Sequence, residues 1–135
     1  MRAGNTRQFG PYRTMTCIRA VKRGAKEMEH PMIACVIRYE IDPFKRDAFE
    51  AYAAMWDDPI PACGADLIGY FAPHEGSLTT AYGLYTVDSL AAYEAYKARL
   101  VAHLGAQAAF AFARREQFIR REERLFLKPV STLRA

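Results

Sequence analysis

A histidine and a glutamate stand side by side in the middle of the chain, and they are its clearest candidates for acid–base chemistry. His74 and Glu75 follow the segment Gly69-Tyr70-Phe71-Ala72-Pro73. An imidazole beside a carboxylate titrates near neutral pH and can give or take a proton. The same segment also contains the aromatic hydroxyl of Tyr70. It therefore predicts a catalytic set of Tyr70, His74 and Glu75. The alternative is a turn whose polar side chains cap backbone groups.

Aromatic residues with polar tips form a second candidate site. Tyrosine and tryptophan make apolar contacts with their rings, while their O–H and N–H groups need partners when buried. A cleft lined by several such residues would suit a flat, apolar organic molecule. We expect such a ligand to contact Trp56, Tyr39, Tyr82 and Arg124. The alternatives are aromatics that only pack in the core, and a cross-strand ion pair for Arg124.

The sequence predicts neither a metal site nor a cofactor. The two histidines other than His74 are His30 and His103, and no local spacing assembles three ligands. Three cysteines are present, at positions 17, 35 and 63, without a C-x-x-C motif. An odd number without such a motif indicates free thiols in a reducing compartment.

The positive charge of the chain is concentrated near its N-terminus. The formal net charge is +4, but residues 1–31 carry seven basic and two acidic groups, and residues 32–135 carry twelve basic and thirteen acidic groups. The later part therefore has no net positive field to attract nucleic acid. No apolar run approaches the length of a bilayer span. We expect neither a nucleic-acid partner nor a membrane span.

Residues 1–31 differ from the rest of the chain. They are rich in Arg, Gly and Thr and show neither the period of a strand nor that of a helix. We interpret them as a disordered basic extension. A targeting presequence would explain such a segment, and so would an upstream start codon chosen in error, which we favour. The folded domain is then predicted to occupy residues 32–135.

Within that domain, strands and helices alternate in a recognisable order. Period-2 and period-3.6 apolar patterns predict a strand over 33–41, a helix over 43–58, a hairpin of strands over 65–72 and 79–87, helical segments over 89–104 and 106–118, and a last strand over 120–128. Asp42 and Pro43 are suited to the N-cap and first position of the first helix. This β-α-β-β-α-β order is the split, ferredoxin-like α+β arrangement, a four-stranded antiparallel sheet with helices on one face.

The other sheet face would then lie bare. A domain of about 100 residues does not leave a whole apolar sheet face in water. We therefore expect a homodimer whose two sheets face each other as a dimeric α/β barrel.

Several segments together resemble the NIPSNAP family. They are Ile41-Asp42-Pro43, Gly69-Tyr70-Phe71 followed by Pro73-His74-Glu75-Gly76, Ser89-Leu90-Ala91-Ala92-Tyr93-Glu94, and Glu123-Arg124 with Pro129-Val130. The resemblance covers essentially all of the chain after residue 31, and it implies the ferredoxin-like fold, a homodimer and a cytoplasmic location. It implies no agreed reaction. The chain has Cys35 and Ile37 where many relatives carry Glu and Arg, which makes its pocket more apolar.

The sequence thus predicts a homodimeric NIPSNAP-like domain that binds a small apolar or aromatic molecule between sheet and helices. The first alternative is a cofactor-independent monooxygenase or isomerase that uses Tyr70, His74 and Glu75. The second is a protein-interaction module without a pocket. Monooxygenases and isomerases both occur on similar dimeric barrels, but a shared fold says little about the chemistry of a site.

Overall fold

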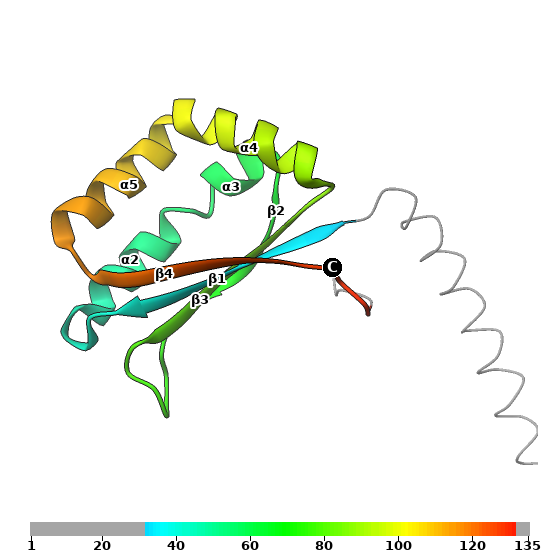
Figure 1. Ribbon diagram of the computed structural model, residues 1–135. Coiled ribbons are helices and arrows are strands. Elements are labelled where there is room, and N and C mark those ends of the chain that lie inside the picture. Colours follow the sequence, from blue (N-terminus) through cyan, green and yellow to red (C-terminus); the bar gives the residue numbers. More distant parts are fainter. Residues whose placement is uncertain (1–31, 132–135) are drawn as a thin grey trace, which may run out of the picture. The chain divides into compact units, whose positions relative to one another are not determined.

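A computed structural model describes residues 32–131, which form a four-stranded antiparallel sheet with its helices on one side (Figure 1). The elements follow one another as β1 (Ile33–Ile41), η1 (Pro43–Lys45), α2 (Arg46–Ala54), α3 (Pro59–Ala62), β2 (Asp66–Phe71), β3 (Thr80–Val87), α4 (Leu90–Ala102), α5 (Leu104–Glu116) and β4 (Ile119–Leu127). This order and the antiparallel sheet confirm the ferredoxin-like α+β prediction. The extension predicted over residues 1–31 lies outside the described range.

Strand β1 is central and decides which side chains face the helices. The strand order is β2-β3-β1-β4, and β1 pairs with both β3 and β4. Cys35, Ile37 and Tyr39 on β1 are buried, whereas Arg38 and Glu40 point to the other face. This alternation follows from the two-residue period of a strand, and the sequence predicts it correctly.

The helix expected over 43–58 consists of the turn η1 and helix α2, and a further short helix, α3, follows it. An Asp42 carboxylate oxygen accepts the Phe44 N–H at 2.9 Å and caps η1, as expected for an Asp-Pro pair. Helix α2 ends at Ala54, and α3 begins at Pro59. Pro59 follows directly after the expected helix and begins α3, because its missing N–H and fixed φ suit a first helical position.

Helices α4 and α5 meet at His103 and not, as predicted, at Gly105. His103 is extended, with φ −84° and ψ 127°, and therefore ends α4. Its ring Nδ1 accepts the backbone N–H of Gly105 at 3.0 Å and of Ala106 at 3.3 Å. The imidazole thus serves as the N-cap of α5, a role usually filled by Asp, Asn, Ser or Thr.

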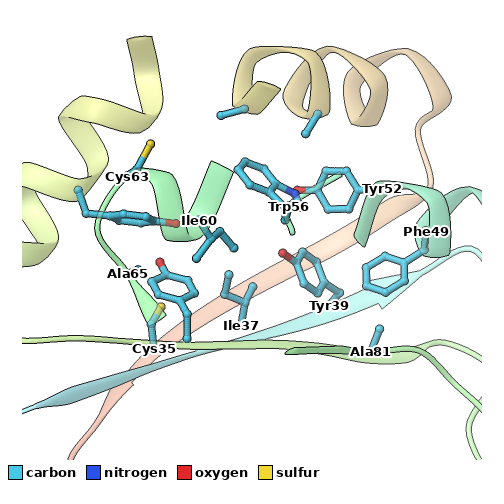
Figure 2. Packing of buried hydrophobic residues seen from close by; sticks show 14 of the residues in the cluster. Cys35, Ile37, Tyr39, Phe49, Tyr52, Trp56, Ile60, Cys63, Ala65 and Ala81 are labelled. Carbon is cyan, nitrogen blue, oxygen red and sulfur yellow. The ribbon is translucent and has the colours of Figure 1, made fainter. Parts of the chain in front are cut away.

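The core lies between the sheet and the helices and is largely aromatic (Figure 2). Tyr39, Phe49 and Phe118 are its largest fully buried side chains. Tyr39 and Phe49 meet edge to face with ring centroids 5.3 Å apart, the arrangement that aromatic quadrupoles favour. Within residues 32–131, every helix is too short or too polar to cross a bilayer.

No helix of residues 32–131 covers the opposite sheet face (Figure 1). A row of apolar side chains lies on this face. The register aligns Leu84 of β3, Val36 of β1 and Leu125 of β4 across the sheet on this face. Leu125 is 42% exposed, and Phe71 and Leu127 are about half exposed. Exposed apolar groups gathered in this way are typical of an interaction surface.

Candidate functional site

A small cleft lies between the inner sheet face and the helices. Its volume is about 40 Å³. Aromatic and aliphatic side chains dominate its walls, and two charged residues join them; the lining consists of Ile37, Tyr39, Tyr52, Trp56, Ile60, Tyr70, Tyr85, Tyr96, Leu100, Phe110, Glu122 and Arg124. A water molecule needs roughly 10–15 Å³ of such space, whereas a cavity that takes benzene measures about 150 Å³. The cleft therefore has room for a small polar group, and a ring would require neighbouring side chains to move.

Trp56, one of the lining residues, carries a buried hydrogen-bond donor. The residue is only 3% exposed, and its Nε1 has no hydrogen-bond partner among residues 32–131. The nearby Tyr52 ring meets the indole edge to face at 5.9 Å between centroids (Figure 2). The Tyr52 hydroxyl lies close to the indole, but the two groups do not meet in the geometry of a hydrogen bond. Because buried donors are nearly always satisfied, this N–H is an exception that invites an explanation.

Two tyrosine hydroxyls, from the strands β1 and β2 on either side of β3, meet in the cleft. The hydroxyls of Tyr39 and Tyr70 lie 3.5 Å apart, which is longer than an ordinary hydroxyl hydrogen bond. Burial raises the pKa of Tyr39 well above its ordinary value, and the neighbouring Tyr70 and Tyr52 add to the rise. Burial likewise raises the pKa of Tyr70. Both groups therefore stay protonated at neutral pH and retain capacity to donate or accept a hydrogen bond.

Strand β4 contributes an ion pair to the same cleft. The Arg124 guanidinium donates to a Glu122 carboxylate oxygen at 2.8 Å, and both side chains are a little over one third exposed. Burial opposes the positive charge of Arg124, but Glu122 and then Tyr85 outweigh it, so the pKa of Arg124 is raised. Glu122 and Arg124 pair with Tyr39 and Ile37 on β1, so their side chains lie on the sheet face that the helices cover. Glu123 lies between them in the chain and points to the opposite face.

Two further tyrosines, from β3 and α4, complete the polar lining. Tyr85 and Tyr96 lie 5.2 Å apart between ring centroids, and burial raises the pKa of each. Tyr85 interacts with the fully buried thiol of Cys35. Burial raises the pKa of Cys35 against the opposing effects of Tyr85 and Arg124. A thiol so placed is a poor nucleophile, in keeping with a role in packing.

The structure brings some predicted ligand-binding residues together and separates others. Trp56, Tyr39 and Arg124 all line the cleft. Tyr82 does not, because it pairs with Arg38 and points to the opposite sheet face. The alternative of a cross-strand ion pair for Arg124 also differs from the structure, where its partner Glu122 lies two residues away on the same strand.

The predicted catalytic set is divided in space. Tyr70 lines the cleft, whereas His74 and Glu75 are exposed in the connection between β2 and β3 and do not line it. A catalytic role for this pair remains an untested prediction, and it would need a site other than this cleft. Among residues 32–131, no group of three His, Cys, Asp or Glu side chains is placed to hold a metal ion.

Sequence reasoning missed several of the residues that make the cleft. Glu122, Tyr52, Tyr85 and Tyr96 were not predicted as ligand contacts. The helical spacing of Tyr52 and Trp56 places them on one face and could have pointed to Tyr52. No comparable signal marks Glu122, because the segment Arg120-Arg121-Glu122-Glu123-Arg124 is charged at every position.

With this geometry established, comparison with known proteins is informative. The NIPSNAP family model matches residues 34–134, about three quarters of the chain. The chain belongs to the NIPSNAP family. No curated protein gives a match to this NIPSNAP domain.

Solved structures of other family members have the same fold. A NIPSNAP family protein of unknown function from Agrobacterium tumefaciens is 20% identical, with a TM-score of 0.64 over 74% of this chain and 89% of that one. An uncharacterised NIPSNAP-like domain protein from Burkholderia xenovorans is 24% identical, with a TM-score of 0.62 over 78% of this chain and 91% of that one. At these identities the similarity establishes the fold and leaves the chemistry open.

The fold also extends beyond the family. A protein from Chloroflexus aurantiacus, provisionally named an antibiotic biosynthesis monooxygenase, is 19% identical, with a TM-score of 0.56 over 76% of this chain and 96% of that one. This similarity, too, concerns the fold alone.

Proposed function

We propose that this NIPSNAP domain binds a small planar organic molecule in the cleft between sheet and helices. The observation that carries the proposal is the buried Trp56 N–H, which has no partner among residues 32–131 and belongs to a residue that lines a cleft walled by aromatic rings. Flat aromatic walls favour a flat ligand, and an unused donor favours a ligand with an oxygen or nitrogen acceptor. In a core that serves packing alone, a buried donor without a partner is unusual, because it lowers stability with nothing to offset the loss.

The size of the cleft limits the ligand. Pockets for drug-sized molecules enclose roughly 300–1,000 Å³. At about 40 Å³ the cleft accepts the polar end of a small molecule directly. Entry of a whole ring requires one of the lining side chains to move. Phe110, which packs against Trp56, is 42% exposed and is therefore the aromatic lining residue most free to move. We therefore expect weak binding of single-ring compounds.

Binding of this kind can be measured at one atom. Trp56 is the only tryptophan of the chain, so its indole N–H gives a single resonance in a nitrogen–proton correlation spectrum. Benzamide should shift that resonance in a saturable way because its carbonyl accepts the free N–H. Cyclohexanecarboxamide carries the same polar group on a ring that is not flat, and it should bind more weakly. Absence of any saturable shift with either compound would contradict the proposal.

Binding explains the cleft better than acid–base catalysis does. The tyrosines of the lining hold their protons, since burial raises their pKa values, and Glu122 is engaged by Arg124. A group poised to take a proton from a substrate needs a pKa near the working pH and geometric access. Within this cleft no residue combines the two.

The domain acts, in this proposal, as a homodimer in a reducing compartment such as the cytoplasm. The apolar outer sheet face supports the dimer, because a second copy can cover it by the same residues in a symmetric contact. The buried free thiols of Cys35 and Cys63 support the reducing setting. Light scattering at micromolar concentration should give about twice the chain mass. A stable monomer would contradict the dimer and leave the ligand proposal standing.

A further inference from the structure

We propose that the cleft selects an uncharged planar molecule that presents a donor and an acceptor side by side, as a carboxamide does, over anionic or cationic molecules of the same shape. The inference rests on the proposed binding function and adds the charge class of the ligand.

The first argument is the charge inventory of the cleft. The residues that line it include one acidic and one basic side chain, Glu122 and Arg124, and these pair with each other at 2.8 Å. The remaining polar groups are neutral: the tyrosine hydroxyls and the Trp56 N–H. The cleft thus carries no net charge, and an incoming ion finds no uncompensated partner.

The second argument is the opposing effect of the two charges on an incoming ion. An anion that contacts the Arg124 guanidinium stands beside the Glu122 carboxylate, which repels it, and a cation that contacts Glu122 stands beside Arg124. Each ion therefore gains one attraction and one repulsion at this exposed pair, whose two members are a little over one third exposed. The ion also gives up part of its own hydration on entering the cleft.

The third argument is hydrogen-bond complementarity. A guanidinium has five N–H donors and a carboxylate has acceptor sites on both oxygens, so the single contact between Arg124 and Glu122 leaves donors and acceptors unused. A carboxamide can donate to Glu122 and accept from Arg124 without disturbing the pair, whereas a carboxylate offers only acceptors and an amidinium only donors.

Three compounds of nearly the same shape test this inference: benzamide is neutral, benzoate is negative and benzamidine is positive. Each is titrated against the full chain, with the Trp56 indole N–H resonance as the readout. The natural chain should bind benzamide about tenfold more tightly than either ion, because an ion is repelled by one member of the pair and gives up its own hydration. Benzoate or benzamidine binding as tightly as benzamide would overturn the charge selectivity and leave the binding function intact. No saturable shift with any of the three would overturn both.

Two variants should alter the selectivity in opposite directions. Glu122→Gln leaves Arg124 uncompensated, so benzoate should gain about tenfold relative to benzamide. Arg124→Gln leaves Glu122 uncompensated, so benzamidine should gain instead. General damage to the fold cannot produce both changes. The matched control is Glu123→Gln, the same substitution one residue along on the opposite sheet face, which should leave the order of the three compounds unchanged. An unchanged order in both cleft variants would also overturn the inference.

Discussion

Gly83 of β3 lies directly against the ring of Tyr70 on β2. A Cβ atom at position 83 would stand 2.7 Å from Cε2 of that ring and 2.9 Å from Cζ. Residues 70 and 83 are paired across the two strands, so both side chains would occupy the same face. The missing side chain of Gly83 is therefore what lets the Tyr70 ring lie over the sheet and place its hydroxyl beside that of Tyr39.

Gly83→Ala should destabilise the domain by about 1–3 kcal/mol, the usual cost of forcing atoms into a packed site. Urea denaturation measures this loss. In a Tyr70→Ala background the same substitution should cost much less, because the clashing ring is gone. Equal costs in the two backgrounds would show that the Tyr70 ring is not the obstacle.

Phe110→Ala should enlarge the cleft. The Phe110 ring lies 5.1 Å from that of Trp56, edge to face, and is 42% exposed. Its removal should improve binding of the two-ring 2-naphthamide relative to benzamide by about tenfold, a scale of roughly 1.4 kcal/mol. Phe44→Ala removes an even more exposed phenylalanine that does not line the cleft, and it should leave that ratio unchanged.

Asp42→Ala should remove stability in a way that depends on pH. The Phe44 N–H that Asp42 accepts holds the pKa of this carboxyl below its ordinary value, against a small effect of burial, and Arg120 contributes further at 3.3 Å. A group with a lowered pKa stabilises the fold above its unfolded-state pKa and loses that contribution as the pH falls through the folded-state value. The natural chain should thus exceed the variant in urea resistance at pH 7 and progressively less below about pH 4. A difference that does not change with pH would contradict this role of the ionised carboxyl.

His103→Ala should destabilise the domain by about 1 kcal/mol, the typical value of a helix N-cap. The imidazole Nδ1 accepts two backbone N–H groups at the start of α5, and alanine cannot replace it. His103→Asn keeps an acceptor suited to the same position and should recover most of the loss in urea denaturation. Similar losses in the two variants would indicate that the ring packing of His103, and not its cap, is what matters.

Leu125→Glu should convert the proposed dimer into a monomer. Leu125 lies on the edge strand β4 of the outer sheet face, aligned with Val36, and a carboxylate there would be buried in the proposed contact between copies. Phe44→Glu introduces the same charge at a side chain that is 94% exposed on η1 and should leave the mass by light scattering unchanged. Retention of the double mass by the Leu125 variant would place the interface elsewhere.

Local chemistry was enough to predict the elements and which side chains of β1 share a face. Alternation along Ile33–Ile41 puts Tyr39 on one face with Ile37 and Ile41, because a strand has a fixed period of two, but it does not say whether that face lies under the helices. The Asp42-Pro43 pair marked a helix start, since a carboxylate cap and a fixed φ act within a few residues.

Only the tertiary structure decided which residues form the site. Strand β4 is charged at five consecutive positions, so its own sequence cannot say whether Glu122 and Arg124 or their neighbours face the helices; pairing with Tyr39 and Ile37 on β1 sets that choice. Likewise, Tyr82 lies on the outer face because it pairs with Arg38 on β1. The unsatisfied state of the Trp56 N–H depends on atoms from separate elements that meet only after folding. Periodicity involves residues close together in the chain and can therefore be recognised in the sequence. Strand register and hydrogen-bond partners involve segments far apart in the chain, so only the folded structure defines them.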